Sequence, residues 1–348
     1  MRFKKTEKQS KSYSKIITKK VLDRPIKNRG ESFKENATFS LSYIIMGFLF
    51  IWMCTVPGFL TFENLYILLQ RVVQLGLLSI GMTLVIITGG IDLSVGSIMA
   101  LACALTGVFQ HWGTSAGYHG AGSYIAPELV IFIMVLGIGA LIGILNGFIS
   151  GIGIPDFAVT LGTMIGVRGA AYAVTGGVQI FGIGPITQNI TQGSIINIPY
   201  VFFVFVVFFM LILIIEKNTI LGKSIYAVGE NSRVAILSGV NYLKTKLIVY
   251  LFSGIFASMA GWILAGRMGI GDPKVGAGAE LEAIAAVIIG GTNLYGGYGG
   301  VEYTLSGVLV IILSQNLMAL YGVSPNVRTI LIALILLIYM VIQKIIKQ

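Results

Sequence analysis

Long apolar stretches, broken by few charged residues, constrain this chain more than any other feature of its sequence. Roughly 20 apolar residues in a helix cross a bilayer core about 30 Å thick. Only 11 % of the residues are charged, against about 25 % in soluble domains. A soluble two-domain enzyme would need polar residues at helical or strand period, which the apolar stretches lack. We therefore expect an all-α, polytopic membrane bundle of about ten helices, over 40–57, 65–88, 94–110, 129–151, 157–175, 198–215, 246–266, 281–291, 301–320 and 327–343.

The segment 281–291 is too short to cross a bilayer alone, so we expect either an extension by its flanks or a half-helix. It also belongs to one of two similar segments within the sequence. The sequence VIITGGIDLSVG (85–96) resembles VIIGGTNLYGG (287–297) with one residue deleted. Either two halves of the chain are duplicated, or Gly-rich helix breaks recur by chance.

Basic residues indicate how the chain is oriented. Residues 1–37 carry twelve Lys or Arg against four acids, which predicts a cytoplasmic tail beside an anionic leaflet rather than a nucleic-acid site. The loop 216–246 and the C-terminal end are also basic, whereas 111–128 and 176–197 have no Lys or Arg. We expect two regions, the tail 1–37 and a membrane domain 38–348, with both termini and the loop 216–246 in the cytoplasm.

No catalytic, metal or cofactor chemistry is expected. Cys54 and Cys103 lie apart within apolar runs, and His111 and His119 share one loop without metal-ligand spacing. The sequence also lacks GxxxxGK[ST], so ATP would have to bind to another chain.

A polar, glycine-rich run separates two apolar segments between residues 88 and 97. Two adjacent glycines let the backbone turn, and unwound backbone within a membrane must face protein or a water-filled cavity. Asp92 or Ser94 can cap the following helix. The run is therefore a structural cap between two half-helices or the polar lining of a substrate path, and its residues are Gly89, Gly90, Asp92, Ser94 and Gly96.

Arg168 is an isolated charge in the fifth apolar stretch. Because an unpaired guanidinium at the bilayer centre costs about 2.5–3.5 kcal/mol on insertion scales, it should pair inside the bundle or reach an interface. We expect an ion pair, with Asp92 or Asp156 as the partner; the alternative is a contact with a substrate.

Four stretches resemble the permease subunits of ribose-, xylose- and galactose-type ATP-binding-cassette (ABC) importers. They are GMTLVIITGGIDLSVGSIMAL (81–101), LNGFISGIGIPDFAVTLGTMIGVRGAAYAVTGG (145–177), GENSRVAILSGVN (229–241) and GDPKVGAGAELEAIAAVIIGGTNLYGGYGGV (271–301). The resemblance implies a type II importer-like bundle in a bacterial inner or plasma membrane, surrounded by lipid. It also implies a second permease chain, two cytoplasmic ATPase modules and an external sugar-binding protein, with ATP hydrolysis on the partners.

By the same resemblance, the loop Gly222 to Lys246 would couple the permease to its ATPases. Asn231 or Ser232 is a suitable N-cap, and Gly239 a suitable stop, for a short helix. The alternative is an interfacial helix lying on lipid.

Apolar residues of this short helix, among them Val234 and Ile236, would pack into a groove of the partner, and small residues would permit close approach. The predicted coupling residues are Asn231, Arg233, Ala235, Leu237, Ser238 and Gly239.

Acidic residues precede the short segment 281–291 on the expected external side. Acids in a first helical turn complement the helix dipole, and the alternative is a rim that contacts the binding protein. The residues concerned are Asp272, Glu280 and Glu282.

Three residues depart from the family's pattern. Asp156 and Tyr303 replace an uncharged residue and a glycine, and Arg328 is an unusual charge near the last helix. They put local packing and substrate identity in doubt.

The function expected from this reading is sugar import by alternating access, driven by separate ATPases. The alternatives are a permease for a nucleoside or sugar-like signal, a stand-alone secondary transporter, and a membrane scaffold without transport. A stand-alone carrier would need coupling-ion sites, usually midplane acids, and Asp92 alone supplies little of that.

Overall fold

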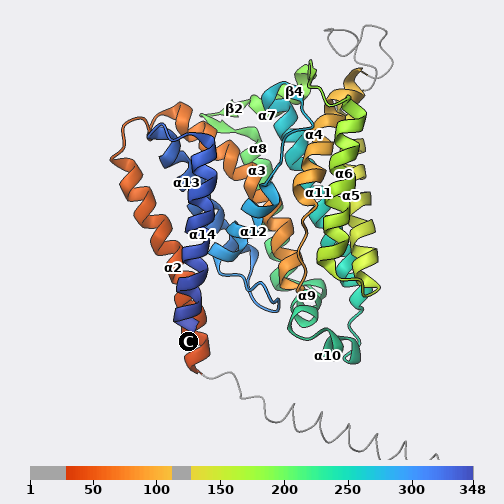
Figure 1. Ribbon diagram of the computed structural model, residues 1–348, viewed down its shortest axis with the longest axis vertical. Coiled ribbons are helices and arrows are strands. Elements are labelled where there is room, and N and C mark those ends of the chain that lie inside the picture. Colours follow the sequence, from red (N-terminus) through yellow and green to blue (C-terminus); the bar gives the residue numbers. More distant parts are fainter. Residues whose placement is uncertain (1–28, 112–126, 348) are drawn as a thin grey trace, which may run out of the picture.

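The computed structural model describes residues 29–111 and 127–347, which form a bundle of helices (Figure 1). Each of the ten predicted apolar stretches coincides with a helix. Residues 1–28 of the predicted tail lie outside the described residues, and the first helix begins inside the tail, at Arg29. The ten helices are α2 (Arg29–Cys54), α3 (Phe62–Ile87), α4 (Val95–His111), α5 (Glu128–Gly151), α6 (Asp156–Thr175), α8 (Tyr200–Asn218), α11 (Tyr242–Met268), α12 (Ala279–Gly290), α13 (Val301–Leu320) and α14 (Pro325–Lys347).

Six helices of the described chain, α3, α5, α6, α8, α11 and α13, are long and apolar enough to cross a membrane. The apolar helix α4 is shorter, with 17 residues. The 12 residues of α12 span only about 18 Å at 1.5 Å per residue. Since that is well below a bilayer core, α12 has the length expected of a half-helix, and a total of ten crossings stays a prediction.

The inner and outer helices of the bundle differ in burial. In their most apolar windows, 89 % of α3 and 72 % of α11 are buried, against 28 % of α5 and 22 % of α8. Glycines let α5 and α11 approach closely, because a Cβ on Gly143 would lie 2.2 Å from the carbonyl oxygen of Tyr250. Gly139, Gly143 and Gly147 are four residues apart, the small-residue spacing of packed membrane helices.

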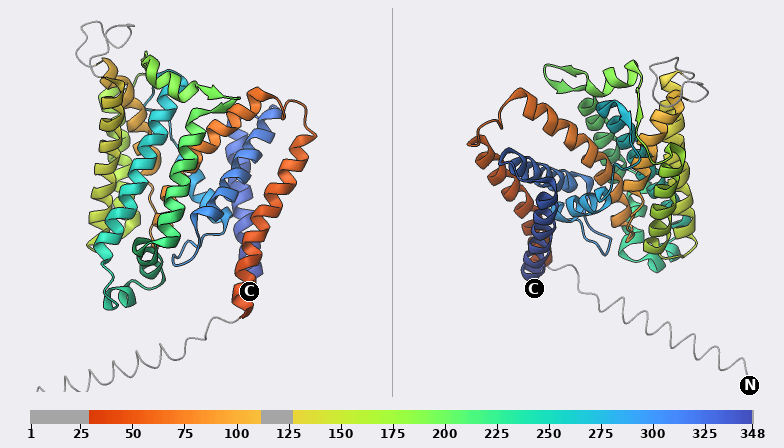
Figure 2. Two further views of the ribbon diagram at one scale, coloured as in Figure 1. Left: turned by 180° about the vertical axis from the view of Figure 1, so that it is seen from behind. Right: turned by 45° about the horizontal axis from the view of Figure 1, so that its top comes forward.

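Two helices that follow α8 lie at one end of the bundle, α9 (Ile220–Glu230) and α10 (Ser232–Leu237). The first residues of α2 and the last residues of α14 lie at this same end (Figures 1 and 2). The start of α2, the end of α14 and the helices of the loop 216–246 therefore share one end of the bundle.

The opposite end of the bundle carries short elements that the apolar stretches do not predict (Figure 1). Glu128, at the start of α5, accepts hydrogen bonds from the backbone N–H groups of Ile186 (3.0 Å) and Thr187 (2.6 Å). A carboxylate so placed stabilises the start of a helix. The elements are helix α7 (Pro185–Gln192), the antiparallel pair β2 (Ser194–Ile195) and β3 (Ile198–Pro199), and the antiparallel pair β1 (Ile180–Phe181) and β4 (Ile270–Gly271).

Candidate functional site

The first helix break lies between α3 and α4, where the sequence predicts it. The N–H of Gly89 donates to the carbonyl of Ile86 (2.9 Å), and that of Gly90 donates to Val85 (3.1 Å). These are the two hydrogen bonds of a Schellman motif. Gly89 has φ +77°, a conformation that glycine adopts without steric cost, so the glycine pair ends α3 at this point.

Asp92 is fully buried in this break and is held by hydrogen bonds. Its carboxylate accepts from the Ser94 hydroxyl (2.5 Å), the Ser94 N–H (3.0 Å) and the Ser253 hydroxyl of α11 (2.7 Å). Asn146 of α5 donates to the Ser94 hydroxyl (2.9 Å) and accepts from Thr163 of α6 (2.6 Å). A buried carboxylate is costly unless it is hydrogen-bonded, so this network favours the structural reading of Asp92.

A second break follows α12 and repeats the backbone geometry of the first. The N–H of Gly291 donates to Ile288 (2.9 Å), and that of Thr292 donates to Val287 (3.1 Å). Gly291 has φ +106°. The two similar segments, 85–96 and 287–297, therefore form the same helix-ending motif, whether or not they arose by duplication.

Both breaks meet the end of α9 at one point. The N–H of Gly297, in the loop after α12, donates to the carbonyl oxygen of Ile87 at the end of α3 (2.9 Å). Gly229 of α9 lies so close that a Cβ there would fall 1.7 Å from that oxygen and 2.6 Å from the Gly297 nitrogen. Only glycine fits without displacement of backbone at this junction.

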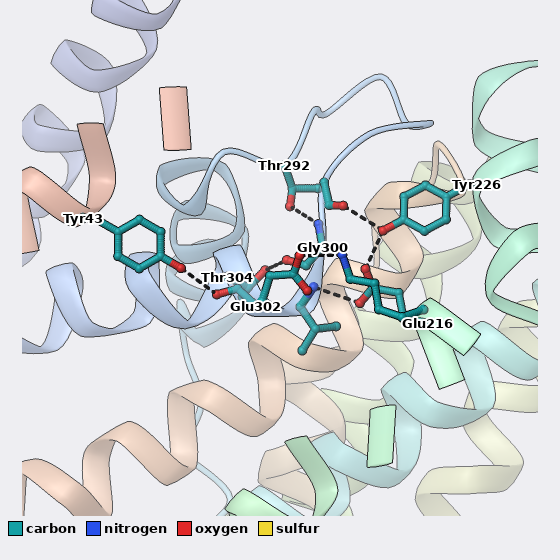
Figure 3. Close-up of polar contacts among 10 residues, drawn as sticks. Tyr43, Glu216, Tyr226, Thr292, Gly300, Glu302 and Thr304 are labelled. Carbon is teal, nitrogen blue, oxygen red and sulfur yellow. Dashed lines mark hydrogen bonds and ion pairs between the residues drawn. The ribbon is translucent and has the colours of Figure 1, made fainter. Parts of the chain in front are cut away.

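A buried carboxylate joins α8, α9 and the start of α13 (Figure 3). Glu216 accepts hydrogen bonds from the Val301 N–H (2.9 Å) and from the Tyr226 hydroxyl of α9. The same hydroxyl lies 2.7 Å from the carbonyl oxygen of Gly299. Burial and the Glu216 carboxylate raise the pKa of Tyr226 well above its usual value, so the hydroxyl keeps its proton at neutral pH.

Partly exposed contacts extend this cluster to α2. The Lys217 Nζ lies 2.5 Å from a Glu302 carboxylate oxygen, and the Tyr43 hydroxyl donates to the Glu302 carbonyl at 3.5 Å (Figure 3). Tyr303, one of the departures from the family's pattern, lies under Lys217, whose Nζ is 5.8 Å from the ring centroid.

Helix α10 has the caps predicted from the sequence. The Asn231 side chain accepts from the Val234 N–H (3.1 Å), and Gly239 has φ +86°. Leu237 is 85 % exposed, and Val234 and Ile236 are about half exposed. Arg233 and Ser238 are exposed as well. The apolar patch Val234–Ile236–Leu237 therefore stands uncovered at the end of the bundle.

Ala235 does not face outward with this patch. It is buried, and α10 packs against α9 and α11. The small side chain thus permits close approach within this chain, not to a partner as the sequence analysis expected.

A polar pocket of about 470 Å³ lies beside α10 and reaches Thr88 and Gly89 of the first break. Asp156 lines it. Its carboxylate forms an ion pair with Lys246 Nζ (2.9 Å) and accepts a hydrogen bond from the Tyr250 hydroxyl (2.9 Å). The unusual acid at position 156 therefore has partners within this chain.

The ion pair predicted for Arg168 is wrong. Its guanidinium instead donates to the backbone carbonyls of Val275 (2.5 Å) and Pro273 (3.4 Å). Asp156 begins the same helix twelve residues earlier, which is about 18 Å away along the axis, and Asp92 is held by hydroxyl groups.

The three acids of the predicted external rim have different surroundings. Asp272 is buried and accepts from Gln179 (2.7 Å), and Glu282 accepts from Gln315 (3.0 Å). Glu280 packs against Gly96, where a Cβ would fall 2.1 Å from its carboxylate. None of these acids is fully exposed, so they do not form one open rim in this structure.

Comparison with known proteins identifies what the chain is similar to. A family model described as "Branched-chain amino acid transport system / permease component" matches residues 64–340. The ribose import permease protein of Escherichia coli (strain K12) is 35 % identical over 296 residues, which cover 81 % of this chain and 86 % of that protein.

Two further relatives have similar coverage. The ribose import permease protein of Bacillus subtilis (strain 168) is 35 % identical over 293 residues, 83 % of this chain and 87 % of that protein. The fructose import permease protein of Rhizobium meliloti is 32 % identical over 297 residues, 81 % of this chain and 78 % of that protein. No solved structure was found to match the chain.

Proposed function

The chain belongs to the family of transport-system permease components, and from that premise we propose that it carries a monosaccharide across the cell membrane within an ABC importer. It is a transport subunit and not an enzyme. ATP is hydrolysed on partner chains, whose conformational cycle switches this chain between outward-facing and inward-facing states.

One observation carries the mechanism: the exposed patch of α10 is connected through α9 to both helix breaks. The patch comprises Val234, Ile236 and Leu237. Such a patch on a short helix suits a groove on a partner, and a two-turn helix gains stability from that packing. We propose that one ATPase module binds there, and that the second binds to the same patch of the second permease chain.

Force applied to α10 has a direct route into the membrane domain. Gly229 of α9 contacts the backbone of Ile87 and Gly297, and Tyr226 contacts Glu216 and Gly299. Tight backbone contacts transmit displacement because packed interiors have few voids. Movement of α9 would therefore shift both breaks together, which is the change that alternating access requires.

The sugar class rests on the relatives. Those described above are named for ribose and fructose, and others for galactofuranose and L-arabinose. A pentose or hexose is therefore the proposed cargo, in preference to a nucleoside or a sugar-like signal molecule.

The proposed assembly follows the same family. It has a second permease chain, two cytoplasmic ATPase domains and an extracytoplasmic sugar-binding protein, in a bacterial inner or plasma membrane. The tail 1–37, the end bearing α10 and the C-terminus face the cytoplasm, as the distribution of basic residues favours.

Reconstituted vesicles test this function. We expect radiolabelled ribose, fructose or L-arabinose to accumulate when the chain is assembled with its ATPase and binding protein and ATP is supplied. A hydrolysis-deficient ATPase is the matched control. Accumulation by the chain alone, without ATP, would instead support a secondary transporter.

A further inference from the structure

A polar pocket of about 250 Å³ lies between α3, α11, α12 and α13, apart from both helix breaks. Arg71 lies nine residues into α3, which places it in the half of the bundle away from α10. The volume is slightly below the range of about 300–1,000 Å³ for drug-sized ligands, so it suits a smaller solute. The polar side chains of its wall are Arg71, Gln74, Arg267, Glu282 and Gln315.

Two guanidinium groups share this pocket. Arg71 and Arg267 both line it, and both side chains are partly buried. Among the described residues, neither guanidinium has a hydrogen bond or an ion pair, although each offers five N–H donors. Two like charges held together with open donors indicate a place for an oxygen-rich ligand.

Acceptors complete the wall of the pocket. Glu282 accepts from Gln315 (3.0 Å). Leu75 and Ile312 supply an apolar surface. Guanidinium donors, a carboxylate, amide groups and apolar side chains in one pocket match a monosaccharide, whose hydroxyls both donate and accept while its C–H groups are apolar.

We propose that this pocket is a subsite for the transported monosaccharide, in which neighbouring hydroxyls accept from Arg71 and Arg267 and donate to Glu282. This inference rests on the proposed function, because it assigns a binding site on the transport path of the same sugar. It differs from the path expected along the Asp92 break, whose polar groups are satisfied within the chain.

Thiol protection in the assembled importer tests the subsite. Ala279 lines the pocket, so Ala279→Cys in a Cys54→Ser background puts a thiol there. We expect D-ribose, D-fructose or L-arabinose, at concentrations that saturate uptake, to slow maleimide labelling several-fold. Leu281→Cys, on the same helix but exposed and outside the pocket, should label at an unchanged rate.

Charge variants separate the subsite from a structural role. Arg71→Gln and Arg267→Gln should abolish the protection and raise the KM of uptake more than they lower its maximum rate. Arg328→Gln, outside the pocket, should change neither. Protection that survives both pocket substitutions would overturn the inference.

Three further outcomes identify what fails. If the wild-type importer takes up a sugar with ATP but no transported sugar protects Ala279→Cys, the subsite is wrong and the proposed function stands. If D-galacturonate alone protects, the pocket binds an anion and the assignment to a neutral sugar is overturned. If the assembled importer moves no sugar at all, the proposed function itself fails, and the subsite with it.

Discussion

The backbone N–H of Gly297 donates to the carbonyl oxygen of Ile87 over 2.9 Å, which ties the loop after α12 to the end of α3. Gly229 of α9 fills the remaining space at this contact. Two breaks more than 200 positions apart in the sequence thus share one junction with α9. The contact connects α9, at one end of the bundle, directly to both breaks.

Gly229→Ala tests this junction. The added methyl would overlap the Ile87 carbonyl, and overpacking of this kind costs about 1–3 kcal/mol. We expect a lower thermal unfolding midpoint in detergent and reduced ATP-driven uptake. Gly162→Ala, where nothing lies within 4 Å, is the matched control and should leave both unchanged. Full activity and unchanged stability of Gly229→Ala would contradict the packing described here.

Leu237→Glu tests the exposed patch of α10. Because Leu237 is 85 % exposed, the charge should leave the fold intact but weaken ATPase binding at least tenfold, which is about 1.4 kcal/mol. Co-purification and titration with the ATPase measure this. Ile220→Glu, at an equally exposed position outside α10, should have a smaller effect. Equal losses in the two variants would mean that α10 is not the specific contact.

Asp92 variants distinguish a structural from a path-lining carboxylate. Asp92→Ala leaves the Ser94 N–H and the Ser253 hydroxyl without their acceptor, and each unsatisfied buried group costs about 1–3 kcal/mol. We expect a marked loss of stability, with a milder loss for Asp92→Asn, which keeps one acceptor oxygen. If Asp92→Ala altered the KM of uptake and left stability unchanged, the path-lining reading would be correct.

Lys246 and Asp156 form a pair that a double-mutant cycle can measure. Lys246→Met leaves the partly buried carboxylate without its cation, which we expect to destabilise the chain by roughly 1–3 kcal/mol, less than for a fully buried pair. Asp156→Asn combined with Lys246→Met should recover part of this loss. Strictly additive losses would show that the two side chains are not coupled.

The sequence predicts what depends on local chemistry. Asn231 caps α10 and Gly239 ends it, and the glycines at 89 and 291 end α3 and α12, because each of these effects involves residues within a few positions. The apolar stretches likewise predict every long helix of the described chain. Six of these helices are long and apolar enough, within the described residues, to cross a membrane.

Contacts between distant segments could not be predicted. Glu128 caps α7 from 58 positions away, and the carbonyls that bind Arg168 are more than 100 positions away. The shared pocket of Arg71 and Arg267 depends on how α3 and α11 pack. No periodicity or spacing in one sequence encodes such pairs.

Distances between spin labels test the central claim, that α9 and the second break move as one unit. With Cys54 and Cys103 replaced by Ser, Ile220→Cys labels α9, Tyr295→Cys labels the loop after α12, and Ile196→Cys labels the opposite end; all three sites are exposed. When ATP binds to the assembled importer, we predict that the 220–295 distance stays constant while the 220–196 distance changes. A change in the 220–295 distance with a constant 220–196 distance would contradict the account.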